Sequence, residues 1–164
     1  MSNATFRAEH REPLTYVALP VTVTITDMGE RVAAAYRQIE LYLASRGINP
    51  SGPGVVRYRG TDQRGAFAVE VGWVIPENTW IDLPYVAELL PAGRYAVAAY
   101  TGPYSALDDV SAEVMMWADL TDLALDVAAG GGEWVSRVEL YLDDPRVGVD
   151  GLEGAVEVCI LTRN

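Results

Sequence analysis

The four letters AVEV occur twice in the chain, within GAFAVEVGWVIP at residues 65–76 and within EGAVEVCILTRN at residues 153–164. Each copy places a single glutamate, Glu70 or Glu157, among β-branched and apolar residues that are typical of strands. A strand, a helix and another strand can be recognised in the sequence before each copy. The repeated stretch therefore predicts two similar halves, each with the element order β-α-β-β.

The first half begins with LTYVALPVTVTI at residues 14–25, which is rich in β-branched residues and indicates a strand. A helix follows, for which we expect a capping box at Asp27 and Glu30 and an end at Gly47. Its apolar face repeats with helical spacing at Val32, Tyr36, Ile39 and Leu43. VVRYR at residues 55–59 then forms a strand pair with the first AVEV stretch.

The second half repeats this order. GRYAVAAYTG at residues 93–102 indicates a strand, and Ser105 and Asp108 mark the start of a helix. WVSRVELYLDD at residues 134–144 and AVEVCILTR at residues 155–163 are the last two strands.

Two such halves predict an α+β domain, in which tandem β-α-β-β repeats form an antiparallel sheet with two helices on one face. We expect one domain at residues 14–162, with halves at about 14–76 and 92–162. A ligand groove would lie between the halves. The segment between the halves contains several prolines and is predicted to be a connector. Residues 1–13 are predicted to form a flexible N-terminal tail.

The composition excludes several classes of function. The formal net charge is −11, which disfavours binding to nucleic acid or to an anionic membrane. No apolar run reaches the ~20 residues of a membrane-spanning helix, so we expect a soluble, cytoplasmic protein. The chain has no lysine, one histidine and one cysteine. No cofactor and no metal site are therefore predicted, and any acid–base chemistry would use carboxyl groups and tyrosines.

Several sequence segments resemble segments of the GyrI-like family. They are GPGVVRYR and FAVEVGWVIP in the first half, and LPAGRYAVAAYTGPYSAL, VELYLDDP and VEVCIL in the second. The resemblance extends from about Leu14 to Thr162. Members of this family include effector-binding domains of multidrug-sensing regulators, DNA gyrase inhibitor proteins, and hydrolases that open cyclopropane rings of cytotoxic natural products.

The resemblance implies tandem SHS2 modules with a pocket for bulky, aromatic and often cationic molecules. It also implies a buried glutamate in the pocket, which we place at Glu157, with Glu70 as its counterpart in the other half. Alternation along the strand gives Glu157 the same face as Cys159 and Leu161, in apolar surroundings. The alternative is that both glutamates face solvent on a one-sided sheet.

Aromatic residues supply the remaining candidates for ligand binding, because tyrosine and tryptophan combine flat apolar rings with a polar group. Trp80, in the connector, could form a lid, whereas Trp117 lies on the apolar face of the second helix and fits the core as well as a ligand. The full set is Tyr58, Trp73, Trp80, Tyr100, Tyr104, Trp117 and Tyr141.

Three functions remain open at this point. The first is a binding protein for hydrophobic, cationic compounds that acts in sequestration or sensing. The second is a hydrolase of the same fold, with Glu157, Glu70 and Tyr141 assisting the addition of water to a strained ring. The third is an inhibitor of DNA gyrase. We expect no helix-turn-helix domain before Leu14, so a DNA-binding regulator would require a partner chain.

Overall fold

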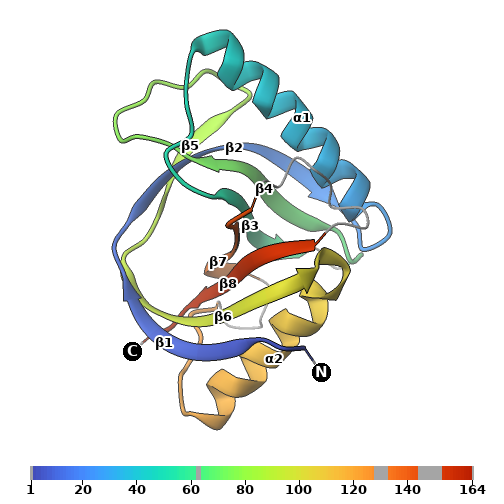
Figure 1. Cartoon of the computed structure of the whole chain (residues 1–164), viewed down its shortest axis with the longest axis vertical. Helices are drawn as coiled ribbons and strands as arrows, with labels where there is room; N and C mark the ends of the chain where they lie inside the picture. Colours follow the sequence, from blue (N-terminus) through green and yellow to red (C-terminus); the bar gives the residue numbers. More distant parts are fainter. Residues whose placement is uncertain (1, 62–63, 128–132, 144–152, 164) are drawn as a thin grey trace.

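The computed structural model describes residues 2–61, 64–127, 133–143 and 153–163, and within them it contains eight strands and two α-helices (Figure 1). The elements are, in chain order, β1 (Thr5–Arg11), β2 (Leu14–Val23), α1 (Met28–Arg46), β3 (Gly54–Thr61), β4 (Phe67–Val74), β5 (Val86–Leu90), β6 (Gly93–Pro103), the 3₁₀ turn η1 (Tyr104–Ala106), α2 (Leu107–Leu120), β7 (Glu133–Tyr141) and β8 (Glu153–Leu161). The series β2-α1-β3-β4 and β6-α2-β7-β8 are the two predicted halves.

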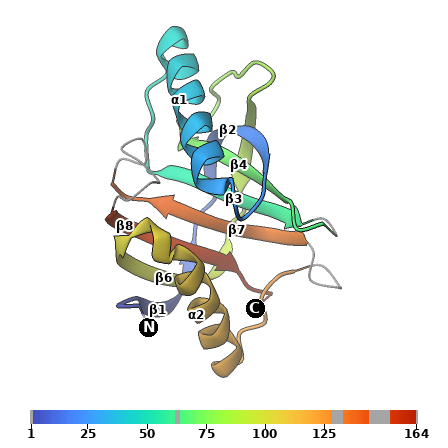
Figure 2. The same cartoon turned by 90° about the vertical axis from the view of Figure 1, so that its right-hand side faces the viewer.

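All strands pair antiparallel in one sheet, in the order β1-β6-β8-β7-β3-β4-β2-β5. The two halves meet at the pairing of β3 with β7, where Val56 lies opposite Glu139. Side chains of α1 and α2 pack into one core with the same face of the sheet, the face toward the viewer in Figure 2. The predicted α+β fold is thus confirmed.

Strands β1 and β5 lie in segments that were expected to be outside the two halves. The segment predicted to be a flexible tail contains β1, which pairs with β6 from Thr5 opposite Ala99 to Arg11 opposite Gly93. The predicted connector contains β5, which pairs with β2. The charged residues of β1 concealed this strand in the sequence, because some of them pair with carboxylates of the sheet rather than with water.

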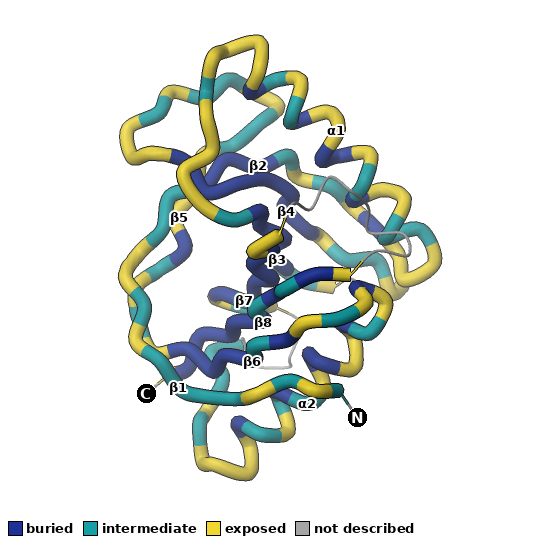
Figure 3. Tube along the Cα trace, viewed as in Figure 1, coloured by how far each residue is buried: buried dark blue, intermediate teal, exposed yellow. Residues whose placement is uncertain are grey.

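The sheet is curled because its two edges are joined by one ribbon. Only two residues separate β1 from β2, and two separate β5 from β6, so the pairing of β1 with β6 continues into that of β2 with β5. The inside of the curl holds a second core that includes Tyr16, Val55, Val97 and Leu140. Figure 3 shows the buried segments of the strands that surround it.

The helix ends match the expectation in part. Gly47 ends α1 in a left-handed conformation with φ of 65°, as glycine favours. The predicted capping box does not form: the carboxylate of Asp27 accepts from the backbone N–H of Thr24 instead. No helix in the part of the chain that the structure describes is long and apolar enough to cross a membrane.

Candidate ligand-binding cleft

Two adjoining clefts open on the helix-covered side of the sheet. The first, here called the central cleft, has a volume of about 280 Å³ and lies between the N-terminal ends of α1 and α2, over β3 and β7. Both halves contribute to its walls. Its lining includes Met28 and Val32 of α1, Tyr58 of β3, Tyr104 of η1, Asp108 of α2, and Arg137, Glu139 and Tyr141 of β7.

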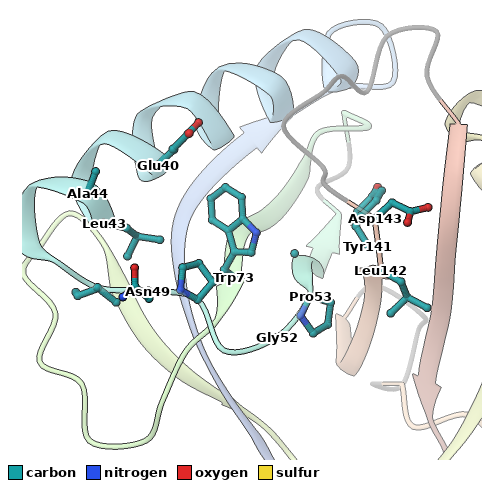
Figure 4. A pocket seen from close by; sticks show the side chains of 13 residues that line it. Glu40, Leu43, Ala44, Asn49, Gly52, Pro53, Trp73, Tyr141, Leu142 and Asp143 are labelled. Atoms are coloured by element: carbon teal, nitrogen blue, oxygen red, sulfur yellow. The ribbon is translucent and has the colours of Figure 1, made fainter.

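The second, here called the α1 cleft, has a volume of about 430 Å³ and runs along the C-terminal half of α1. Figure 4 shows the Trp73 ring beneath the helix, with Tyr141 and Asp143 across the opening. Tyr141 lines both clefts, so its ring forms part of the boundary between them.

Glu139 is the buried carboxylate of the central cleft. Strand alternation places it on the helix side of β7 together with Arg137 and Tyr141. Its side chain is held by two phenols: Tyr141 donates to Oε1 over 2.7 Å and Tyr58 donates to Oε2 over 3.1 Å. With only 3% of the residue exposed, these tyrosines replace water around the carboxylate.

Burial dominates the electrostatics of this group. Loss of water raises the pKa of Glu139, and the opposing effects of the tyrosine hydrogen bonds and of the Arg137 charge do not cancel this rise. Burial and the Glu139 charge together raise the pKa of Tyr58 and of Tyr141 well above 10. Both phenols therefore remain neutral hydrogen-bond donors at physiological pH.

Aromatic rings form much of the apolar wall. Tyr104 meets Tyr141 edge to face at 5.2 Å between ring centroids. Trp73 meets Tyr36 in the same manner at 4.9 Å, and the Tyr36 hydroxyl donates to the backbone oxygen of Val55. These contacts fix the rings in place, so that they present preorganised surfaces to a planar ligand.

The structure brings four of the predicted aromatic residues to the clefts: Tyr58, Tyr104 and Tyr141 line the central cleft, and Trp73 and Tyr141 line the α1 cleft. The other three lie elsewhere. Tyr100 is buried and donates to the backbone oxygen of Pro103, and Trp117 stacks on Phe6 of β1. Trp80, predicted as a lid, is 75% exposed beside Arg46 and lines neither cleft.

The two AVEV glutamates lie on the opposite, inner face of the sheet and line neither cleft. Glu157 forms ion pairs with Arg7 and Arg11, each at 2.9 Å. Glu70 accepts hydrogen bonds from Tyr16 and, at 3.1 Å, from Arg59. The structure therefore does not bring these carboxylates together in either cleft, and the buried glutamate that lines the central cleft is Glu139.

Replacing Glu157 by glutamine is expected to lower the free energy of unfolding by about 1.5 kcal/mol, because two charge-assisted hydrogen bonds from β1 are weakened. Burial opposes ionisation of Glu157, but the hydrogen bonds from Arg11 and Arg7 outweigh it and lower its pKa. The ion pairs therefore stabilise the fold above the unfolded-state pKa of about 4.5, and this contribution is lost as the pH falls through the lowered value.

Urea denaturation at neutral pH and at pH ~2, where the carboxyl group of Glu157 is protonated in both states, would measure this difference. Replacing the exposed Glu12 of the same segment by glutamine is the matched control and should change little. A stability difference for Glu157→Gln that persists unchanged at low pH would contradict the assignment.

A family model described as a GyrI-like small molecule binding domain matches residues 4–161. The chain belongs to the GyrI-like family. No curated protein sequence matches this GyrI-like domain.

Solved structures share the fold at low sequence identity. The C-terminal domain of EcmrR has a TM-score of 0.66 at 13% identity, and the alignment covers 99% of each chain. In the complex of EcmrR with DNA the TM-score is 0.76 at 13% identity, with 97% of this chain covered; the chain spans only 57% of that EcmrR chain.

Two further structures concern ligands and activity. SAV2435, solved with bound tetraphenylphosphonium, has a TM-score of 0.63 at 13% identity, covering 98% of this chain and 94% of that chain. A hydrolase from Listeria innocua has a TM-score of 0.61 at 11% identity, covering 96% and 91%. At these identities the likeness establishes the fold of the GyrI-like domain and nothing finer.

Glu139 and Arg137 are two charged residues of the central cleft that were not predicted from the sequence. The available signal was the spacing within VELY, where Glu139 shares a strand face with Tyr141, a residue already predicted as a ligand contact. A carboxylate two positions from a candidate tyrosine on a strand lies within reach of the same ligand.

Proposed function

We propose that this protein binds bulky aromatic cations in the central cleft, with Glu139 as the group that pairs with the cationic charge. The observation that carries the proposal is a carboxylate that is 3% exposed, lines an aromatic cleft and accepts hydrogen bonds from two neutral tyrosines. Tyr58, Tyr104 and Tyr141 would contact the aromatic part of the ligand.

A carboxylate in this position favours a cation strongly because little water competes for it. Coulomb attraction grows as the effective dielectric falls, and an arriving cation offsets the penalty that burial imposes on the ionised carboxyl group. Aromatic rings add cation–π attraction and apolar contact. The hydrogen bonds from Tyr58 and Tyr141 hold the carboxylate in place, so that little ordering is required when the ligand binds.

The neighbour SAV2435 supports the proposed ligand class, since its structure contains tetraphenylphosphonium, an aromatic cation without hydrogen-bond donors. For such an ion, electrostatic attraction and ring contacts are the available sources of affinity. The central cleft of this protein offers both.

The direct test is a fluorescence titration with a cationic rhodamine methyl ester, followed by competition with tetraphenylphosphonium. Saturable binding that tetraphenylphosphonium displaces is the expected result. A sulfonated anionic dye is the control and should bind much more weakly. Equal affinity for cationic and anionic dyes would overturn the proposal.

Hydrolysis is the second candidate function, and the hydrogen-bonded pair of Glu139 and Tyr141 favours it. In this reaction, Glu139 would take a proton from water as the oxygen attacks a carbon of a strained cyclopropane. The ring C–C bond would break, with its electron pair passing to an adjacent carbonyl whose oxygen accepts the hydrogen bond that Tyr141 otherwise donates to Glu139. The proton taken up by Glu139 would then pass to the resulting enolate, so that one water is added overall. Mass spectrometry after incubation with a cyclopropane-containing alkylator should then show the adduct of one water; an uncatalysed rate would exclude this function.

A further inference from the structure

Arg137 places a positive charge in the central cleft beside the carboxylate of Glu139. Its guanidinium lies 4.5 Å from the ring centroid of Tyr58 and 5.3 Å from that of Trp134. Only Val138 separates Arg137 from Glu139 on β7, so the two charged groups lie on the same face with their Cα atoms roughly 7 Å apart. The cleft wall thus carries a cation and an anion side by side.

The guanidinium of Arg137 has no acceptor among the described residues. Its Nε atom is buried without a hydrogen-bond partner, and no carboxylate of the described ranges lies within ion-pair distance. Ring faces hold it by cation–π contact and leave its donors free. Buried arginine donors without acceptors are rare, since each lacks a hydrogen bond that water would otherwise supply.

Arg57 provides a comparison within the same sheet. It lies on the inner face of β3, and its guanidinium donates to Tyr16, to the backbone oxygen of Leu89 and to that of Val135. Both terminal nitrogens of Arg57 thus donate to acceptors of the protein, although its Nε, like that of Arg137, is buried without a partner. Arg137, in contrast, presents its donors in a cleft that is open to a ligand.

We infer that the cleft selects zwitterionic aromatic ligands, in which the cationic group pairs with Glu139 and an anionic oxygen group, such as a carboxylate, pairs with Arg137. This inference rests on the proposed function and narrows its ligand class. Guanidinium and carboxylate match in geometry, and their charge-assisted hydrogen bonds are about twice as strong as neutral ones.

The other charged group that lines the central cleft is Asp108 of α2. Its carboxylate opposes an anionic ligand group, and its charge contributes to the raised pKa of Glu139. It forms no ion pair with Arg137 in the described structure, so it does not neutralise the guanidinium. Replacing Asp108 by asparagine should therefore leave the selection by Arg137 in place.

A matched pair of dyes tests the inference. Tetramethylrhodamine carries a free carboxylate beside its cationic ring system, and its methyl ester has the same rings without the negative charge. Isothermal titration calorimetry with the full chain should show about tenfold tighter binding of the free acid, the effect of one charge-assisted pairing. Arg137→Gln should bind both dyes with equal affinity, whereas Arg37→Gln, at an exposed position of α1, should retain the preference.

The outcomes separate this inference from the proposed function. Equal binding of both dyes by the wild-type protein, or a preference that survives in Arg137→Gln, overturns the role of Arg137 and leaves the cationic site intact. The wild-type ratio requires no variant, so a failure of Arg137→Gln to fold does not weaken the test. If Glu139→Gln no longer binds either dye, the cationic site is supported. If the wild-type protein binds neither dye, both proposals are overturned.

Discussion

Replacing Glu139 by glutamine is expected to weaken the binding of a cationic rhodamine ester on the order of 50-fold. Glutamine keeps the shape of the side chain: its amide oxygen can accept from one of the two phenols, Tyr58 or Tyr141, and its amide nitrogen can donate to the oxygen of the other, but it carries no charge. A cation that left water for the cleft would then find no buried anion there, only the exposed carboxylate of Asp108. Fluorescence titration of both proteins, with tetraphenylphosphonium as competitor, measures the change.

The same substitution should stabilise the fold at neutral pH, which separates loss of binding from loss of structure. Because burial raises the pKa of Glu139, the folded protein holds its proton more tightly than the unfolded chain does. The stabilising contribution of the protonated form is complete below the unfolded-state pKa of about 4.5 and is lost as the pH rises through the folded-state value. Glutamine mimics the protonated form, so its advantage in melting temperature should grow from pH ~4 to pH ~8.

Glu157→Gln is the matched control for binding, since Glu157 lies on the opposite face of the sheet. Its affinity for the dye should equal that of the wild-type protein, although its stability is lower. The reverse pattern, with binding lost in Glu157→Gln and kept in Glu139→Gln, would place the cationic site on the inner face of the curl.

Gly72→Ala is expected to lower the free energy of unfolding by about 3 kcal/mol. Gly72 lies on β4 opposite Ala18 of β2, and a Cβ atom there would lie 1.7 Å from the backbone oxygen of Val17. A side chain could rotate away from such a clash, but a backbone carbonyl within a paired strand can move only if β2 separates from β4. Urea denaturation followed by tryptophan fluorescence measures the loss.

Gly47→Ala provides a comparison at a glycine whose constraint is conformational. Gly47 adopts φ of 65°, and a Cβ atom would meet nothing within 4 Å. The expected loss is about 1 kcal/mol, from the left-handed conformation alone. If Gly72→Ala were no more destabilising than Gly47→Ala, the close approach of β2 and β4 would not be limiting.

Element order and helix placement could be predicted from the sequence because they depend on local patterns. Apolar side chains at helical spacing gave α1, and the strand patterns around AVEV gave β4 and β8. Strands β1 and β5 could not be found in this way. Their partners are far away in the chain, and their charged or exposed residues are stabilised by those partners rather than by a local apolar pattern.

The structure places the two AVEV glutamates away from the clefts that the predicted aromatic residues line. Strand alternation correctly gave Glu157 the same face as Cys159 and Leu161. However, this sheet has a core on each side, so both of its faces are apolar. Alternation along a strand does not tell which of the two faces the helices cover. Glu157 was therefore assigned to the clefts, although it lies among arginines inside the curl. The arginines themselves come from β1, the strand that was missed.

Strands β1 and β5 have a consequence for how the two halves are joined. Each half is preceded in the chain by a leading strand, and each leading strand pairs with the other half: β1 with β6, and β5 with β2. The molecule is therefore equivalent to a strand-swapped dimer of a five-element unit that has been fused into one chain. Either unit alone would present a leading strand without its partner, and a second copy of the unit could supply that partner.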